Sequence, residues 1–259
     1  MIFPNALLLS PVLRWLTYAV YVLSAAGIPS KQFDYVDAIN CSPNADPCDV
    51  ARPFVEKVTN FSRTAIFHAA LITIQNKAGT APGQEHTIAF GKDSSGNVIS
   101  TDASTGERSR SRVPAISNGF ADLHNHLRNT PPSSGDLYGL MRQNKKNRRY
   151  GTRYVITGAG NIYAFIVTDT SAASAFLLKY PPQQETGYSP LFPDALLDEY
   201  RDIQYKYGAS EEMAMAYLLE NYAAGVSLLK QEENGVFIQL RTSVSTAGHE
   251  LVFRTNNCK

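Results

Sequence analysis

Residues 122–136 read DLHNHLRNTPPSSGD, a strand-like run followed by a Pro-containing loop and the start of a helix. Side chains of a strand alternate between its two faces, so the spacing predicts His124 and His126 on the same face. After the loop, Ser133 occupies the position of a helix N-cap, and Asp136 follows in the first helical turn. The pattern therefore predicts two imidazoles and one carboxylate close together.

Two neutral imidazole nitrogens and one carboxylate, with a fourth position open for water, form the ligand set of a catalytic zinc site. A simpler interpretation uses the same residues. Ser-x-x-Asp ahead of apolar residues is also a variant of the helix capping box, and His-x-His occurs in many strands by chance. Both fragments lie within one short segment, however, and that combination favours a metal site.

The spacing of this segment resembles the signature of the JAMM (MPN-type) zinc metallopeptidases, in which His-x-His is followed by Ser-x-x-Asp. The form HNH at residues 124–126 and PSSGD at residues 132–136 is most similar to the bacterial branch that includes the RadC-type proteins. The likeness is specific over about fifteen residues. Leu127 stands where the family usually has Pro.

The resemblance implies a role for each residue of the segment. His124, His126 and Asp136 would bind Zn²⁺, Ser133 would stabilise the oxyanion, and a Glu on an upstream strand would act as general base. The resemblance also implies the fold, an α/β domain with a mixed β-sheet flanked by helices that is JAMM/MPN-like (cytidine-deaminase-like). The helical patterns near the end of the chain add a helical C-terminal portion to this expectation.

Glu85 is the predicted general base. It opens EHTIAF (residues 85–90), a strand-like run that ends at a turn rich in Gly, Asp and Ser, so a hairpin is predicted here. A general base needs a carboxylate within reach of the water that it activates. The alternative is that Glu85 is an exposed residue at a strand start. Glu56, on a predicted helix, and Glu107, in a polar loop, are weaker candidates.

Length and charge limit the classes of function. A chain of 259 residues can bury a sizeable core, and a net charge of +1 creates no general attraction for nucleic acid or a membrane surface. We expect a peptide or protein substrate and no nucleic-acid partner.

The predicted division of the chain is an apolar N-terminal segment (1–30), a loop (31–48) and the metallopeptidase-like domain (49–259).

The N-terminal apolar segment leaves two alternatives open. Pro11 and Arg14 interrupt it, and it is short for a membrane-spanning helix, so no stable span is expected. The small residues of Ser24–Gly27 would suit the cleavage site of a signal peptide; otherwise the segment is an amphipathic helix packed on the domain. The resemblance implies a bacterial protein, and these two alternatives make it either exported or cytoplasmic.

The cysteines depend on the same choice. Cys41 and Cys48 lie in a loop-like segment, and Cys258 stands next to the C-terminus. In an exported protein Cys41 and Cys48 could close a small disulfide loop, whereas in the cytosol all three would be free thiols. The odd number leaves at least one cysteine unpaired in a monomer.

The remaining elements are predicted from periodicity and turn residues. Residues 101–112 form a polar loop, which either borders the substrate groove or is a solvated connector. A long helix is expected at residues 49–75, with Pro53 in its first turn, and a strand hairpin at 154–157 with 162–168. Two helices are expected at 193–207 and 210–231, and a closing strand pair at 236–241 with 249–253.

A basic cluster follows the predicted Asp136 helix at residues 142–149. Positive charge is favourable at a helix C-terminus, and that explains the cluster without a function. The functional alternative is attraction of an acidic partner or of nucleic acid.

These observations predict a zinc-dependent metallopeptidase that hydrolyses a peptide or isopeptide amide bond. The alternative is a JAMM-like binding or scaffold module without catalysis, because a fold by itself does not establish a substrate. The letters His-Asn-His also name a nuclease motif, but that motif places its residues far apart in sequence.

Overall fold

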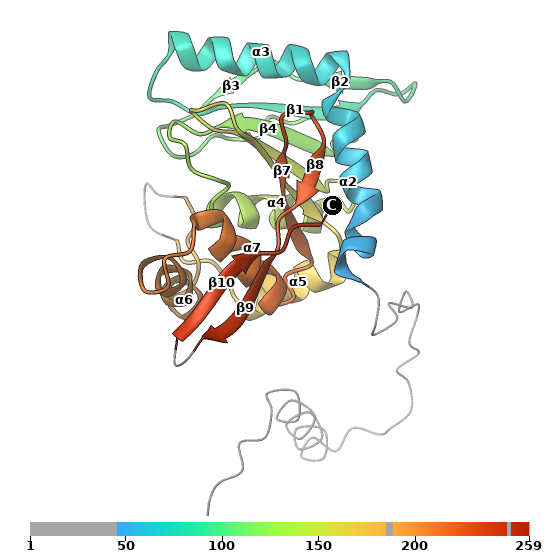
Figure 1. Cartoon of the computed structure of the whole chain (residues 1–259). Helices are drawn as coiled ribbons and strands as arrows, with labels where there is room; N and C mark the ends of the chain where they lie inside the picture. Colours follow the sequence, from blue (N-terminus) through green and yellow to red (C-terminus); the bar gives the residue numbers. More distant parts are fainter. Residues whose placement is uncertain (1–45, 185–188, 248–249, 259) are drawn as a thin grey trace, which may run out of the picture. The chain divides into compact units, whose positions relative to one another are not determined.

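The computed structural model describes residues 46–184, 189–247 and 250–258, which form an α/β domain (Figure 1). A mixed sheet of eight strands lies between helices on both of its faces. The predicted α/β class and the mixed sheet flanked by helices are confirmed. The apolar segment 1–30 and Cys41 lie outside the described residues. Within the described ranges, no helix has the length and apolar character needed to cross a membrane.

The helices of the described chain are α2 (Pro47–Ser62), α3 (Ala65–Thr80), α4 (Ser134–Lys146), α5 (Thr170–Lys179), α6 (Asp194–Tyr205) and α7 (Glu211–Asn221). The strands of the large sheet are β1 (His86–Lys92), β2 (Val98–Ser100), β3 (Ser104–Thr105), β4 (Ala121–Asn125), β5 (Thr152–Ile156), β6 (Ile162–Val167), β7 (Val226–Gln231) and β8 (Phe237–Gln239). A separate ribbon consists of β9 (Thr242–Ala247) and β10 (Glu250–Thr255).

The order of the sheet is β2-β1-β4-β5-β6-β7-β8, with β3 beside β1. Only β4 and β5 pair in parallel, and α4 connects them. Parallel neighbours need such a crossover, which carries the chain back past the sheet and places the start of α4 near the end of β4. The predicted hairpins β1–β2 and β5–β6 are both present and antiparallel.

The two faces of the sheet bury different clusters. One cluster joins α2 and α3 to the sheet through side chains that include Phe67, Phe90 and Tyr154. The other joins α4, α5, α6 and α7 to the opposite face, and includes Leu140 and Phe165. Figure 1 shows α3 and α4 on opposite sides of β1 and β4. The even-numbered residues of β4 face the α4 side, and that is where the candidate site lies.

The predicted helix over residues 49–75 is two helices. The side chain of Asp46 caps α2, which therefore begins at Pro47 inside the predicted 31–48 loop. It ends at Ser62, and the Thr64 side chain caps α3 by accepting from the Phe67 N–H at 3.4 Å. Pro53 lies inside α2 and not in its first turn. The periodic apolar pattern continues across both helices, which hid the break.

The predicted helix over residues 210–231 is wrong in its second half, because α7 ends at Asn221. Positive φ angles at Ala223 (48°) and Gly225 (64°) turn the chain, and a Cβ at Gly225 would lie 2.3 Å from the Asp169 carbonyl oxygen. The chain then enters β7, between β6 and β8. An apolar run of this kind fits a buried strand as well as a helix.

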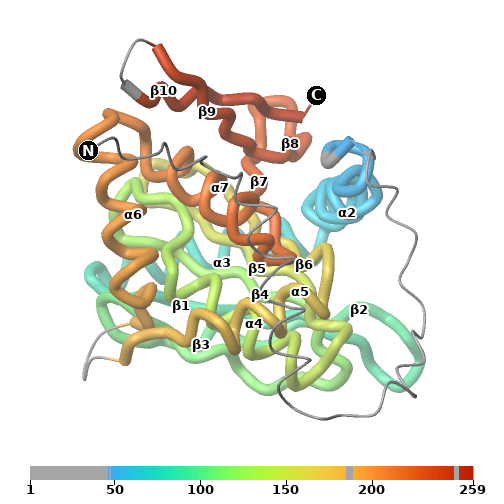
Figure 2. Tube along the Cα trace, turned by 90° about the horizontal axis from the view of Figure 1, so that it is seen from below, coloured from blue at the N-terminus to red at the C-terminus, as the bar shows by residue number. Residues whose placement is uncertain are grey.

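The predicted closing strand pair is also wrong in its partners. β8 pairs with β7, whereas β10 pairs with β9. In Figure 2 the β9–β10 ribbon lies outside the large sheet and next to α7. The C-terminal portion therefore contains the predicted helices α6 and α7, and it has more strands than the single pair that the sequence predicted. The helix α5 was not predicted.

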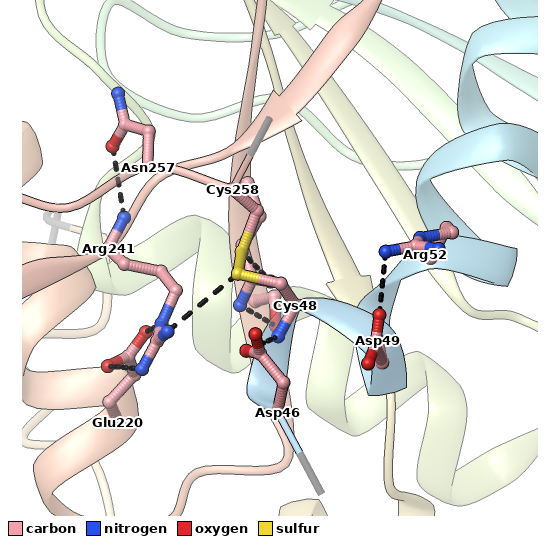
Figure 3. Close-up of a disulfide and its surroundings, with 10 residues drawn as sticks. Asp46, Cys48, Asp49, Arg52, Glu220, Arg241, Asn257 and Cys258 are labelled. Carbon is pink, nitrogen blue, oxygen red and sulfur yellow. Dashed lines mark hydrogen bonds and ion pairs between the residues drawn. A yellow bond between two sulfur atoms is a disulfide. The ribbon is translucent and has the colours of Figure 1, made fainter.

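A disulfide joins Cys48, at the start of α2, to Cys258, near the end of the chain (Figure 3). Their Cα atoms lie 5.4 Å apart. The predicted pairing of Cys48 with Cys41 is therefore wrong, as is the alternative of three free thiols. Beside the disulfide, Arg241 donates to Glu220 at 2.7 Å and also contacts the sulfur of Cys48. Sequence distance favoured the nearer cysteine, whereas the fold brings the two ends of the domain together.

Candidate metal centre

The end of β4 and the start of α4 bring His124, His126 and Asp136 together as predicted. The Nε2 atom of His124 lies 3.0 Å from Asp136 Oδ1, and the Nε2 atom of His126 lies 3.1 Å from Asp136 Oδ2. One ligand atom from each residue falls within 4.8 Å of the others. This group is compatible with a metal site.

The outer ring nitrogen of each histidine faces an oxygen of the protein. His126 Nδ1 lies 3.1 Å from the Thr130 carbonyl oxygen, which can only accept, so Nδ1 carries the hydrogen. His124 Nδ1 faces Asp122 Oδ1 at 3.8 Å. A carboxylate or carbonyl behind a ligand imidazole orients the ring and leaves Nε2 for the metal, as is usual at metal sites.

Asp122 is the centre of a buried network behind the histidines. The Nε and Nη2 atoms of Arg153 donate to its carboxylate at 3.0 Å, and the Tyr150 hydroxyl donates to it at 2.6 Å. Burial raises the pKa of Asp122, but Arg153 and His124 outweigh burial and lower it. Through Nη1, Arg153 also donates to the backbone carbonyl of Asp136 at 3.1 Å. One guanidinium thereby connects β5, β4 and α4.

The charges of the cluster support one another. Burial lowers the pKa of His124, but the Asp136 and Asp122 carboxylates more than offset burial and raise that pKa to about 10. Burial raises the pKa of Asp136, whereas His124 and His126 outweigh burial and bring it well below the ordinary value for a carboxyl. Without a cation, this carboxylate is therefore stabilised by the proton-bearing imidazole of His124.

Ser133 caps α4 as predicted. Its Oγ accepts from the Asp136 N–H at 3.3 Å, and its own N–H donates to Asp136 Oδ2 at 2.8 Å. The Ser133 hydroxyl also donates to the same Oδ2 at 2.7 Å. The capping box and the convergence of the three ligand residues are therefore both present. Asp136 takes part in the capping box and also contacts the two histidines.

Glu85 immediately precedes β1 and lies beside the cluster. It lines two cavities, of about 270 Å³ and 1270 Å³, and Asp136 lines both as well. Burial raises the pKa of Glu85 to about 7, although the nearby His124 opposes the shift. No group in the described ranges donates a hydrogen bond to its carboxylate. The weaker candidates Glu56 and Glu107 are both exposed, and Glu107 pairs with Arg110.

Asn125, between the two histidines, holds the backbone on both sides of Glu85. Its Oδ1 accepts from the His86 N–H at 2.7 Å, and its Nδ2 donates to the Gln84 carbonyl at 3.4 Å. Backbone hydrogen bonds with Gly106 and Glu107 add to this support. The position of Glu85 is therefore defined by the histidine strand itself.

Sequence reasoning did not find Asp122, Asn125 or Arg153. Asp122 precedes His124 by two residues, so the alternation of a strand could have placed it on the histidine face. No sequence signal connects Arg153 to the site, because β5 and β4 become neighbours only through the crossover. The predicted loop 101–112 contains the short strand β3, and its remaining part borders the site, since Ser109 and Ser111 line the smaller cavity.

The arrangement offers two imidazole nitrogens, a carboxylate for a cation, and a second, uncommitted carboxylate beside them. No protein-family model matches the chain, and no curated protein matches it either.

Proposed function

We propose that this chain is a zinc-dependent metallopeptidase that hydrolyses a peptide or isopeptide amide bond. The observation that carries the proposal is the convergence of His124, His126 and Asp136 next to the buried, unpaired carboxylate of Glu85. We further propose that the domain is JAMM/MPN-like, since β1, which Glu85 immediately precedes, pairs directly with the strand that carries His124.

The donor set suits zinc. Ligand atoms held about 2.0–2.1 Å from one tetrahedral ion lie about 3.3 Å apart. The distances from the Nε2 atom of His124 to Asp136 Oδ1 and from the Nε2 atom of His126 to Asp136 Oδ2, 3.0 and 3.1 Å, are close to this separation, and one ligand atom from each residue lies within 4.8 Å of the others. The Thr130 carbonyl and the Asp122 carboxylate also leave both Nε2 atoms facing inward.

In the proposed mechanism Glu85 is the general base. When bound, zinc would lower the pKa of a coordinated water and polarise the substrate carbonyl. Glu85 takes a proton from water and later delivers it to the leaving amine, and the burial that raises its pKa in the metal-free protein favours this role. The Ser133 hydroxyl donates to the oxyanion. To do so, it gives up the hydrogen bond that it donates to Asp136 in the free site.

Elemental analysis of the purified protein tests the metal part of the proposal. We expect about one zinc per chain in the wild type, and its loss in both His126→Ala and Asp136→Ala. His68→Ala is the matched control, because His68 is exposed on α3 and should leave the zinc content unchanged. Absence of zinc after reconstitution would contradict the proposal.

Hydrolysis of peptide and isopeptide substrates tests the catalytic part. Glu85→Gln should keep zinc and lose turnover, whereas full hydrolysis by Glu85→Gln would show that another group is the base. Zinc without any amide cleavage would favour the binding or scaffold module, and metal-dependent DNA cleavage would favour a nuclease.

A further inference from the structure

The smaller cavity extends from the metal centre along α4. Its lining includes Gly135, Asp136, Gly139, Arg142 and Lys146. Residues three and four apart share one face of a helix, so these residues form a continuous stripe. The first part of the stripe has glycines beside Asp136, and the last part has two cations. A substrate lying in this cavity therefore contacts the metal centre at one end and positive charge at the other.

The cations at the far end have no acidic partner among the residues that the structure describes. No carboxylate lies within 4.0 Å of either Arg142 or Lys146 there, although both line the cavity. Arg110 faces the same cavity and pairs with Glu107, at a position where both side chains are exposed to solvent. This end of the cavity is therefore positively charged, while Glu85 and Asp136 lie at the other end.

We propose that Arg142 and Lys146 bind a carboxylate of the substrate, so that the enzyme prefers peptides with an acidic group near the hydrolysed amide. This inference rests on the proposed hydrolysis of an amide. Asp136 and Arg142 are six positions apart, about 9 Å along a helix axis at 1.5 Å per residue. An extended peptide rises about 3.3 Å per residue, so the acidic group lies two or three residues from the reacting bond.

The rest of the basic cluster does not share this position. All five cations are exposed, but Arg142 and Lys146 line the cavity, whereas Lys145, Arg148 and Arg149 do not. Their charge at the end of α4 is explained by the helix dipole. Sites that bind single-stranded nucleic acid combine basic residues with aromatic side chains on which bases stack. Among the described residues, no Phe, Tyr or Trp lines this cavity. A peptide carboxylate is the better match.

Peptide binding to zinc-loaded Glu85→Gln protein tests the inference without turnover. Nine-residue peptides carry a neutral fluorophore and an amidated C-terminus, with one Glu or, as the matched peptide, one Gln. We expect the Glu peptide to bind about tenfold more tightly by fluorescence anisotropy, as for hydrogen bonds to charged groups. Adding Arg142→Ala or Lys146→Ala should remove most of this difference, and adding Lys145→Ala should not change it.

Two further measurements test whether the bound carboxylate is a side chain or a C-terminus, and whether the site binds DNA instead of a peptide. A Gln peptide with a free C-terminus that equals the Glu peptide would assign the site to a terminal carboxylate. Equal binding of the Glu and amidated Gln peptides would overturn the inference. A single-stranded DNA oligonucleotide that binds more tightly than the Glu peptide, and is weakened by Arg142→Ala, would also overturn it.

Cleavage of a peptide mixture by the wild type separates this inference from the proposed function. Products with Asp or Glu two or three residues from the cleaved bond, identified by mass spectrometry, would support both. Cleavage without an acidic preference would refute the carboxylate site alone. Selective binding of the Glu peptide without any cleavage would refute the proposed hydrolysis and leave the carboxylate site standing.

Discussion

Glu85 is a carboxylate in surroundings that disfavour its charge. Glu85 is buried, with 8 % of the residue exposed to solvent. No hydrogen-bond donor among the described residues contacts its carboxylate. Burial raises its pKa to about 7 from an ordinary value of 4.5. Groups that perform proton transfer at neutral pH commonly have such a pKa, and the fold loses stability in order to provide it.

We expect Glu85→Gln to stabilise the metal-free protein at high pH. Because the folded pKa exceeds the unfolded one, the folded state retains a proton that the unfolded state has lost, and wild-type stability falls between pH 4.5 and 7. The Gln variant carries no such proton. Its free energy of unfolding should equal that of the wild type near pH 4 and exceed it by up to about 3 kcal/mol at pH 8.

Urea denaturation in the presence of a chelator, at several pH values, measures this difference. A difference between Glu85→Gln and the wild type that does not change with pH would show that burial does not raise the pKa of Glu85.

Asn125 positions Glu85 through two backbone groups. We expect Asn125→Ala to reduce kcat by about tenfold, with zinc content unchanged, because misplacing a catalytic group by about 1 Å can cost more than this. Asn144→Ala is the matched control, since Asn144 is also buried and donates to backbone carbonyls, but at the end of α4. A similar fall of kcat in both variants would indicate general destabilisation instead of positioning.

At the scale of elements, the β4–α4–β5 unit assembles the site. β4 supplies His124, α4 supplies Asp136, and Arg153 of β5 bonds to both strand and helix. This packing needs a glycine on α4, because a Cβ at Gly139 would lie 2.1 Å from Arg153 Nη1. The metal ligands are therefore oriented by the contact between α4 and the sheet.

We expect Gly139→Ala to displace Arg153 and lower the free energy of unfolding by about 1–3 kcal/mol, with weaker zinc binding, because buried charged groups lose hydrogen bonds. Gly79→Ala on α3 is the control. A Cβ there meets nothing within 4 Å, and alanine should raise stability by up to about 1 kcal/mol. Denaturation and zinc titration measure both effects, and unchanged zinc affinity in Gly139→Ala would show that Arg153 does not support the metal site.

At the scale of the whole domain, the Cys48–Cys258 disulfide connects two ends that are 210 residues apart. It fastens the start of α2 next to Arg241 and Gln239, near the last described residues. Disulfides persist in oxidising compartments, so this bond favours the exported alternative over the cytoplasmic one.

We expect reduction, or the double change Cys48→Ser with Cys258→Ser, to lower the free energy of unfolding by about 2–5 kcal/mol, since a long closed loop restricts the unfolded chain strongly. Cys41→Ser should have no such effect. Urea unfolding with and without a reductant measures the loss. An unchanged unfolding midpoint after reduction of the wild type would show that this bond does not form or does not stabilise the domain.

Local patterns in the sequence were enough to predict most of what surrounds residues 122–136. The alternation that runs along β4 and on to His126, just after its end, placed both histidines on one side, and Ser133 with Asp136 carried the signal of a capped helix. The β1–β2 hairpin followed from its turn residues. These features depend on residues that are close in sequence, because strand and helix periodicity and helix capping all act over a few residues.

The tertiary structure decided what depends on distant parts of the chain. Residues 226–231 became a strand because β6 and β8 offer partners, although their apolar pattern continued that of α7. Arg153 reached Asp122 only after the crossover through α4. Cys48 found Cys258 because the fold brings the ends of the domain together. The residues of the candidate site were thus readable from local spacing, whereas its buried support and its covalent closure arise from long-range packing, which no local pattern encodes.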